Sequence, residues 1–492
     1  MGAPTIADSP PVSLTTLTDE TRLVVANLGD RAVGLRTPAV RLGVTGLARA
    51  GKTVFITALV HNLMHGGRLP MFRAYSGGRI AGAALQPQPD DHVPRFDYER
   101  NVAALIDDRV WPESTRAISE LRLTVRYQSA SFFTRALRSG KLHIDIVDYP
   151  GEWLLDLPLL HKSYAEWSRE TLERAALPAK RTVAAAWLAK VAALPDSPRE
   201  DETIARDLAA SFTAYLRALR TSDGMISTEP PGRFLMPGDL DASPALTFAP
   251  LPLPNGEATS PLARMMARRY ESYKSHVVRP FFRDHFARLD RQIVLADVLA
   301  ALNAGGNAIA ELETALANVL ESFRLGRAGW LTGLVSRKID RILFAATKAD
   351  HLHHGDHDRL EAILSRLVTR AASRARFAGA KVEVAALASV RSTREASITR
   401  VGETLPAIIG TPLPGESVDG RIFDGNSEVA IFPGDLPNDI EPLFKPNAPP
   451  TDVRFVRFRP PKLERTAEGL TLSLPHIRLD RALEFLFGDK FA

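Results

Sequence analysis

The hydrophobic pattern opens on a short apolar run and then changes to helical spacing. The run "AVRLGVTG" covers residues 39–46 and ends in glycine, and a glycine- and alanine-rich turn follows it. Residues 53–67, "TVFITALVHNLMHGG", then place apolar residues three and four positions apart and close on two glycines. This order predicts a strand, a loop and a helix.

More strands are predicted after a long connection over residues 68–119. Residues 121–128, "LRLTVRYQ", alternate apolar and polar positions, as expected for a half-exposed strand on the edge side of a sheet. Strands that alternate with helices predict a parallel sheet covered on both faces. That alternation is predicted with strands over 141–148, 291–296, 341–346 and 381–386, a loop over 297–306, and helices over 308–326 and 358–375.

Residues 152–288 carry apolar residues at helical spacing instead, around one irregular stretch rich in proline and glycine. We therefore predict an α/β sheet domain that is split in sequence by a helical insertion and followed by a small α+β appendage. The predicted units are a leader (1–40), a first part of the core with the phosphate loop and both switches (41–151), the helical insertion (152–288), a second part of the core with base recognition (289–391), and the C-terminal appendage (392–492).

Composition narrows the class of protein. Hydrophobic residues make up 45% and charged residues 24% of the 492 positions, which is typical of a globular protein. The net charge of +5 comes without a dominant basic block, so it permits contact with an anionic partner but does not require one. Residues 453–461, "VRFVRFRPP", interleave three arginines with aromatic residues, and an alternating strand over 453–459 explains this pattern. Three arginines are too few for the usual phosphate footprint, so no nucleic-acid partner is expected. The absence of cysteine excludes disulfides, thiolate metal sites and thiol catalysis. No secretory signal is recognisable, and the apolar run 183–194 is shorter than the ~20 residues that span a bilayer. A cytoplasmic location is predicted, and peripheral contact at the inner membrane stays open.

Residues 46–53, "GLARAGKT", fit the phosphate-loop pattern G-x-x-x-x-G-K-[ST]. Glycines let backbone N–H groups surround phosphate oxygens at a helix N-terminus, while Lys52 reaches the β- and γ-phosphates and the Thr53 hydroxyl binds Mg²⁺. A chance glycine turn is the alternative. The motif lies between a predicted strand and a predicted helix, which favours nucleotide binding.

The second candidate motif is "DYPG", residues 148–151, at the end of an apolar strand. Asp148 could hold the Mg²⁺ shell, and the Gly151 N–H could contact the γ-phosphate as a switch. Glu152 follows, where a glutamine commonly orients the attacking water. This glutamate could accept a proton from that water, or it could be an exposed side chain at the start of the insertion.

The third motif, "TKAD" at residues 347–350, fits [NT]-K-x-D and favours guanine over adenine. The Asp350 carboxylate can accept from guanine N1 and N2, whereas adenine has no such donor pair, and the Lys348 stem can lie along the ring. A solvated turn is the alternative for this tetrapeptide alone. Backbone N–H groups near Ser389 and Val390, after the next strand, are candidates to contact the base oxygen.

A first switch is predicted in "WPESTRAISE", residues 111–120. Thr115 could close on Mg²⁺ and the γ-phosphate, and Trp111 could stack on the base or ribose. The alternatives are a helix N-cap at Ser114 or Thr115 and core packing of Trp111. Arg49 and Arg116 are candidates for an arginine that stabilises charge during hydrolysis.

Longer strings resemble the YcjX-type bacterial P-loop GTPases, a stress-associated family formerly described as a domain of unknown function. They include "GVTGLARAGKTVFITALVHNL", "WPESTRAISELRL", "DIVDYPGEWLLDLPLL", "TKADH" and "ALASVRST". The resemblance implies a Ras-like core with a helical insertion, a GTP/GDP cycle, and a membrane-anchored partner in a phage-shock type response. The residues that match the family's nucleotide contacts are Arg49, Ala50, Gly51, Lys52, Thr53, Val54, Trp111, Ser114, Thr115, Arg116, Lys348, Asp350, His351, Ser389 and Val390.

The predicted function is Mg²⁺-dependent GTP binding with slow hydrolysis, used as a switch with a protein effector. Two other classes stay open: an ATPase that uses only the phosphate loop, and a membrane-associated scaffold whose assembly nucleotide controls. The predicted catalytic residues are Lys52, Thr115 and Glu152, the metal-binding residues are Thr53, Thr115 and Asp148, and Gly46, Gly151 and Thr347 complete the nucleotide site.

A histidine-rich stretch, "HLHHGDHD", follows the guanine motif. His353 and His357 have the i, i+4 spacing of a helical metal pair. A zinc site would also need a third ligand and groups that orient the first three. A polar loop that leads into a helix is therefore the favoured interpretation.

Overall fold

The computed structural model describes residues 37–46, 49–115, 117–128, 140–221, 229–240, 243–321, 339–400, 403–445, 448–451, 453–463 and 473–492. Within them, seven strands form one central sheet in the order β2-β3-β4-β1-β5-β6-β7. Strands β4, β1, β5, β6 and β7 are parallel, and β3 and β2 continue the sheet antiparallel to their neighbours. Their bounds are β1 Ala39–Gly46, β2 Ile80–Gln86, β3 Ser119–Tyr127, β4 Gly140–Asp148, β5 Arg291–Ala296, β6 Arg341–Ala346 and β7 Lys381–Ala386.

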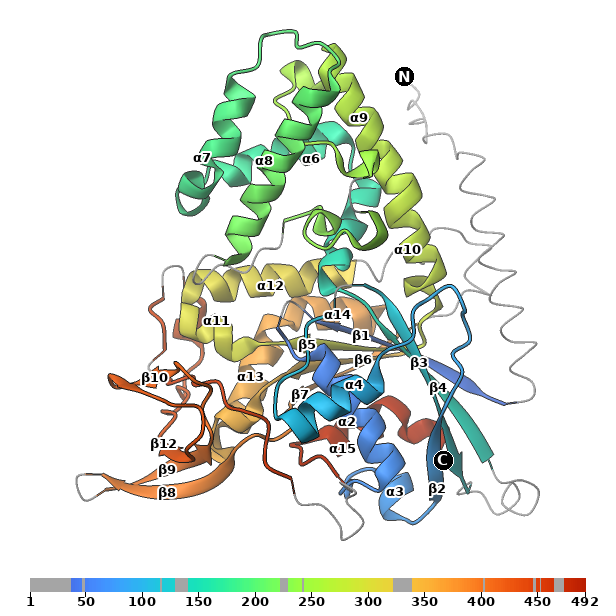
Figure 1. The fold of residues 1–492 in the computed structure, drawn as a ribbon, viewed down its shortest axis with the longest axis vertical. Coiled ribbons are helices and arrows are strands. Elements are labelled where there is room, and N and C mark those ends of the chain that lie inside the picture. Colours follow the sequence, from blue (N-terminus) through green and yellow to red (C-terminus); the bar gives the residue numbers. More distant parts are fainter. Residues whose placement is uncertain are drawn as a thin grey trace, which may run out of the picture.

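Both faces of this sheet are buried. On β5 every residue is buried, and Ile293 and Leu295 face one core while Val294 and Ala296 face the other. Such continuous apolar strands are what a parallel sheet with two covered faces requires. The expected Ras-like P-loop fold class, with helices on both faces, is therefore confirmed (Figure 1).

The helices divide between the two faces. One face packs against α2 (Lys52–His65) and α15 (Leu479–Phe487), so the last helix of the chain returns to the sheet. The Asn62 side chain on α2 donates to the Leu474 carbonyl at 3.0 Å and accepts from the Leu474 N–H at 2.8 Å, which fixes the segment before α15. The other face packs against α11 (Val298–Ala304), α12 (Gly306–Glu321), α13 (His357–Leu367) and α14 (Thr369–Phe377).

Between β4 and β5 the chain forms a helical layer beyond α12 (Figure 1). Its aromatic core includes Trp167, which stacks on Tyr270 with ring centroids 5.1 Å apart, and Trp187, which packs on Phe212 at 4.9 Å. Its elements are the 3-10 helix η2 (Gly151–His161), α6 (Tyr164–Ala175), α7 (Pro178–Ala192), α8 (Glu202–Thr221), the 3-10 turns η3 (Gly232–Phe234), η4 (Gly238–Leu240), η5 (Pro244–Leu246) and η6 (Pro254–Gly256), α9 (Pro261–Tyr273), the π-helix η7 (Lys274–Val278), α10 (Arg279–Asp284) and the 3-10 turn η8 (Phe286–Arg288).

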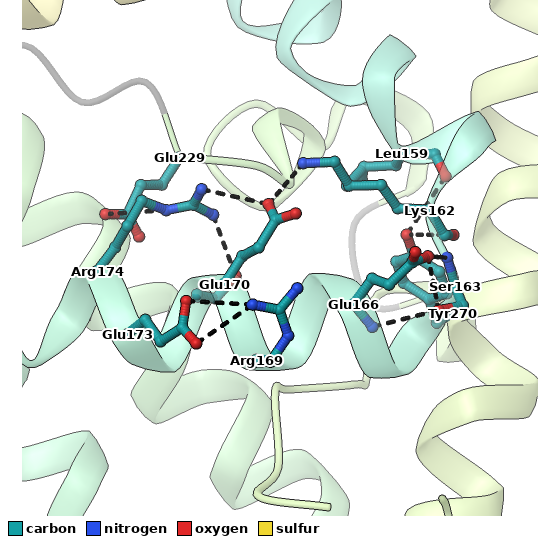
Figure 2. A network of polar contacts seen from close by, with 11 residues as sticks. Leu159, Lys162, Ser163, Glu166, Arg169, Glu170, Glu173, Arg174, Glu229 and Tyr270 are labelled. Atoms are coloured by element: carbon teal, nitrogen blue, oxygen red, sulfur yellow. Dashed lines mark hydrogen bonds and ion pairs between the residues drawn. The ribbon is translucent and has the colours of Figure 1, made fainter. Parts of the chain in front are cut away.

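A polar network holds the start of this layer together, as Figure 2 shows. Glu170 on α6 accepts from Lys162 at 2.6 Å and lies 3.6 Å from Arg174. The buried carboxylate of Glu229 accepts from Lys180 at 3.0 Å, and the same ammonium lies 3.4 Å from Glu311 on α12. The helical layer is therefore bound to the core through α12.

Several predicted elements were wrong in detail. Residues 80–86 form β2, so β3 is not an edge strand; this segment, "IAGAALQ", consists mostly of small residues and carries little hydrophobic signal. Residues 298–304 form α11 rather than a loop, and 357–377 form two helices rather than one. Within the long connection before β3, α3 (Arg73–Ser76) precedes β2, and α4 (Tyr98–Ala103) and the π-helix η1 (Ala104–Asp108) follow it.

After β7, a three-stranded sheet in the order β12-β9-β8 forms with a short β10-β11 pair beside it. The predicted arginine-rich strand over 453–459 is instead extended chain, with one bridge between Phe458 and Pro412. The element bounds are β8 Arg394–Arg400, β9 Glu403–Gly410, β10 Ser417–Val418, β11 Arg421–Ile422, β12 Val429–Ile431, and the 3-10 turns η10 Ala349–His351, η11 His354–Asp356, η12 Glu441–Phe444 and η13 Gly488–Lys490. The division of the chain into five units stays a prediction. Among the described residues, no helix combines the length and apolarity needed to cross a membrane.

Candidate functional site

The phosphate loop lies where β1 ends and α2 begins. Gly51, the residue before α2, has a φ of 84°, in the left-handed region that glycine adopts without strain. A Cβ on Gly46 would meet the Leu295 carbonyl oxygen at 2.6 Å, so this position also requires glycine. Arg49 is exposed and has a φ of 62°. The loop therefore turns sharply and presents the N-terminus of a 14-residue helix, where backbone N–H groups attract anions.

Lys52, the first residue of α2, turns back over the loop. Its Nζ donates to the Gly46 carbonyl at 3.2 Å, and the residue is 8% exposed. A carbonyl does not neutralise a buried ammonium, so Lys52 retains a positive charge that can attract an anion. This is the position from which a lysine can bind phosphate oxygens.

Three oxygen-bearing side chains from separate segments meet beside Lys52. The Thr53 Oγ1 lies 3.4 Å from the Thr115 Oγ1, which donates to the Asp148 Oδ2 at 2.6 Å. Among the described residues, the buried Asp148 Oδ1 has no hydrogen-bond partner. Burial raises the pKa of Asp148 to about 6, against the opposing effects of the Lys52 charge and the Thr115 hydrogen bond. Two hydroxyl oxygens and a carboxylate with one oxygen outside any hydrogen bond are the kind of oxygen ligands that Mg²⁺ binds.

The segment after Asp148 is buried. Gly151 and Glu152 begin η2, and Glu152 is 6% exposed, so the interpretation of Glu152 as an exposed side chain was wrong. A Cβ on Gly232 would meet the Glu152 carbonyl oxygen at 1.9 Å, which shows how closely the insertion packs on this segment. The candidate second switch and the helical layer are therefore in direct contact.

The guanine motif is held by a loop that comes after β7. The Asp350 Oδ2 accepts from the Ser392 N–H at 2.8 Å and from the Ser392 hydroxyl at 2.6 Å, and the Thr393 hydroxyl donates to the Asp350 carbonyl. Thr347 is buried and donates through its N–H to the Ala296 carbonyl at 2.9 Å. The Asp350 carboxylate is thus fixed in one orientation, which recognition of a base by this group would require.

Lys348, in the same motif, has a φ of 62° and pairs through its Nζ with Asp297. Asp297 directly follows β5 and also caps α11, because its Oδ1 accepts from the Ala300 N–H at 3.1 Å. The sequence signal for this cap is an Asp directly before "VLAALN". The predicted loop over residues 297–306 missed both helix α11 and the pairing of Asp297 with Lys348.

The candidate first switch segment is connected to the candidate guanine motif through Phe458. The Trp111 indole N–H donates to the Phe458 carbonyl at 2.6 Å, while the His351 ring lies edge-on to the Phe458 ring with centroids 5.5 Å apart. Trp111 is half-buried against the core that contains α2, and burial lowers the pKa of His351. Phe458 lies in the run over residues 453–459 where arginines alternate with other residues, a pattern that indicates no contact with residues 347–351.

Some of the predicted site residues meet beside Lys52, and others lie around Asp350. A few of the predicted residues lie in neither group. Ser114 is exposed and, with Thr115, lies in a coil segment, so the helix N-cap interpretation was wrong. Ser389 and Val390 are buried directly after β7, and it is Ser392, beyond them, that contacts Asp350. Ala50 is buried and Val54 packs partly into the core behind the loop. Arg116 lies outside the described residues.

Comparison with known proteins agrees with this arrangement. Residues 40–491 match the model described as "YcjX-like family, DUF463". The Ras-like GTPase YcjX of Escherichia coli (strain K12) is 38% identical over 470 residues, which cover 92% of this chain and 95% of the relative. The Ras-like GTPase YcjX of Shewanella oneidensis (strain MR-1) is 33% identical over 501 residues, covering 97% and 99%. The chain therefore belongs to the YcjX-like family.

Proposed function

We propose that this chain binds guanine nucleotide together with Mg²⁺, hydrolyses GTP slowly, and acts as a nucleotide-controlled switch. The observation that carries the proposal is the meeting of Thr53, Thr115 and Asp148 beside Lys52, at the end of a glycine-bounded loop. The names of the two relatives, both Ras-like GTPases, support the same reaction.

In this proposal the phosphates lie along the N-terminus of α2, with the Lys52 ammonium on the β- and γ-oxygens. A Mg²⁺ ion held by the Thr53 and Thr115 hydroxyls, with Asp148 behind them, would neutralise charge on the phosphates. The Gly151 N–H contacts the γ-phosphate, and Glu152 accepts a proton from the attacking water. We expect hydrolysis to be slow because a glutamate carboxylate brings negative charge toward an already anionic phosphate.

The switch surface in this proposal comprises residues near 111–116 and 148–160. Both segments are attached to parts of the chain outside the phosphate site: Trp111 to Phe458, and η2 to the insertion through Asp156. Loss of the γ-phosphate would release Thr115 and Gly151, and these attachments would carry the change outward. A competition titration tests nucleotide identity; equal affinity for ATP and GTP would overturn the guanine assignment.

Substitution of Asp350 by asparagine is expected to reduce the preference for GTP over ATP at least about tenfold, because a site built to hydrogen-bond a donor pair discriminates strongly. An asparagine amide offers one donor and one acceptor, which suits xanthine, whose C2 carries a carbonyl where guanine has an amine. The variant should therefore gain affinity for xanthosine triphosphate. Competition titrations with the three nucleotides measure both changes, and the gain shows that the variant is folded.

Ser392→Ala is the matched control, since it removes the hydroxyl donor to the Asp350 Oδ2 but keeps the backbone donor at 2.8 Å. It should weaken GTP binding by a smaller factor and leave the base preference in place. An Asp350→Asn variant that binds all three nucleotides as the wild type does would show that Asp350 does not read the base.

We also propose, from the family resemblance, that the effector is a protein. The setting would be a bacterial envelope or phage-shock type stress response, with the chain in the cytoplasm or at the inner membrane. A pulldown from native cells, with the chain held in the GTP and GDP states, tests this. A partner retained in only one nucleotide state is the expected result.

A further inference from the structure

A cluster of metal-ligating side chains lies outside the nucleotide site, between the turn after the guanine motif and strand β8. His353, His354 and Glu395 each offer one ligand atom, and these three atoms lie within 4.8 Å of one another. His354 Nδ1 and Glu395 Oε2 are 2.9 Å apart, and the two histidine rings are 4.2 Å apart between centroids. Two imidazoles and a carboxylate from segments about 40 residues apart in sequence therefore converge.

The three side chains are held by their local structure. His353 is the residue before the 3-10 turn η11, with its Nδ1 3.5 Å from the Gly355 N–H, and His354 is the first residue of that turn. Glu395 lies on β8, whose pairing with β9 sets its direction. The second oxygen of this carboxylate, Oε1, lies 3.5 Å from an Arg391 guanidinium nitrogen. Glu395 is thus oriented by a neighbour on one side and faces His354 on the other.

His357, the histidine that spacing alone paired with His353, is not part of this cluster. It is buried, and its Nε2 lies 2.9 Å from the Ala349 carbonyl, where it joins α13 to the guanine motif. The i, i+4 pair was therefore the wrong pair. The third ligand that the sequence lacked is supplied by β8, which hydrophobic patterning did not reveal.

We propose that His353, His354 and Glu395 form a binding site for one divalent transition-metal ion of the Zn²⁺ type. Imidazole nitrogens and one carboxylate are ligands of borderline ions, and three protein ligands leave a position for water. Ligand atoms around tetrahedral zinc are roughly 3.3 Å apart, given bond lengths of about 2.0–2.2 Å. The cluster would have to contract by at most about 1.5 Å, which side-chain rotation can supply.

The site has a structural consequence, because its two segments already enclose Asp350. Ser392 and Thr393, just before Glu395, hold the Asp350 carboxylate and carbonyl, and His353 and His354 lie three and four residues after Asp350. The Ser392 and Thr393 contacts already connect the segment after β7 to Asp350. A bound ion would add a second connection, between strand β8 and the turn that contains His353 and His354. The site is accessible, since the His354 side chain is 65% exposed and that of Glu395 33%.

Titration of ZnCl2 into the full chain, expressed without a polyhistidine tag and kept in excess MgCl2, tests the proposal. We expect one Zn²⁺ per chain, with no displacement by Mg²⁺, because Mg²⁺ prefers an all-oxygen shell. His354→Ala and Glu395→Gln should each weaken this affinity at least about tenfold. His92→Ala, which removes an exposed histidine outside the cluster, is the control and should leave the affinity unchanged.

Two results would overturn the proposal: no stoichiometric Zn²⁺ in the wild-type chain, or equal affinity in all three variants. The cluster would then be a surface His–Glu ion pair only. Because the titration contains no nucleotide, its outcome is independent of whether the chain binds GTP. Both test positions are at least partly exposed, so the variants should fold, and their circular dichroism spectra can be compared with that of the wild type.

Discussion

Substitution of Lys52 by alanine is expected to reduce GTP binding and hydrolysis at least about 100-fold, because it removes a positive charge that acts inside a largely water-excluded site. The Lys52 side chain is almost fully buried, and its Nζ donates to the Gly46 carbonyl at the edge of the phosphate loop. Lys52 is the buried cation whose charge acts on Asp148, whereas Arg49 in the same loop is exposed. We therefore expect little compensation by Arg49.

Equilibrium titration with a fluorescent GDP analogue and a phosphate-release assay measure this effect. Lys141→Ala is the matched control, because it removes an exposed lysine at the start of β4, at the opposite end of the strand from Asp148, and should change neither value by more than about twofold. Near-normal binding by the Lys52→Ala variant would show that phosphates do not lie along α2. Loss of binding in both variants would indicate a general defect in folding.

The phosphate side of the site could be predicted from sequence because its chemistry is local. The strand, loop and helix around residues 46–53 are contiguous, and the glycines at 46 and 51 occupy positions where a side chain would clash or φ is positive. Asp148 is the last residue of an apolar strand, so the strand pattern placed it at the edge where parallel strands end. Thr115 was proposed from its order along the chain, and in the fold it contacts Asp148.

The base side was harder to predict because its contacts come from distant segments. Ser392 and Phe458 reach the guanine motif from loops that follow β7, and nothing in the periodicity of those loops indicates which residue faces Asp350 or His351. Similarly, the residues of α15 fall within the predicted C-terminal appendage (392–492). Its apolar face packs on the central sheet, a choice of partner that a hydrophobic stripe alone does not specify.

One buried carboxylate contributes three hydrogen bonds to the link between the candidate second switch and the rest of the insertion. Asp156 on η2 accepts from the Gly232 N–H at 2.7 Å, the Arg233 N–H at 3.2 Å and the Tyr273 hydroxyl at 2.6 Å. Burial raises its pKa to about 6, so the side chain is largely ionised at pH 7 despite being 2% exposed. Beside it, the Arg233 guanidinium lies over the Trp153 ring, 3.2 Å from the centroid. Two segments of the insertion thus attach to η2 at one point.

Substitution of Asp156 by alanine is expected to lower the free energy of unfolding by about 3 kcal/mol, because three buried donors lose their acceptor together. Urea denaturation measures the change. Asp196→Ala, at an exposed position between α7 and α8, should remain within about 0.5 kcal/mol of the wild type. Tyr273→Phe should cost less than Asp156→Ala. In the Asp156→Ala background it should cost still less, since the hydroxyl has already lost its partner.

The same variant separates a structural role of Asp156 from transmission of the nucleotide state. Hydrogen–deuterium exchange in the GDP-bound chain and in the chain with a non-hydrolysable GTP analogue should differ over residues 229–240 in the wild type, because Gly232 packs directly on Glu152. In Asp156→Ala that difference should disappear while the difference over residues 111–115 persists, since Thr115 responds through Asp148. If the variant loses stability but retains both differences, the insertion receives the nucleotide signal by another route, such as the Lys180 bridge to Glu311 on α12.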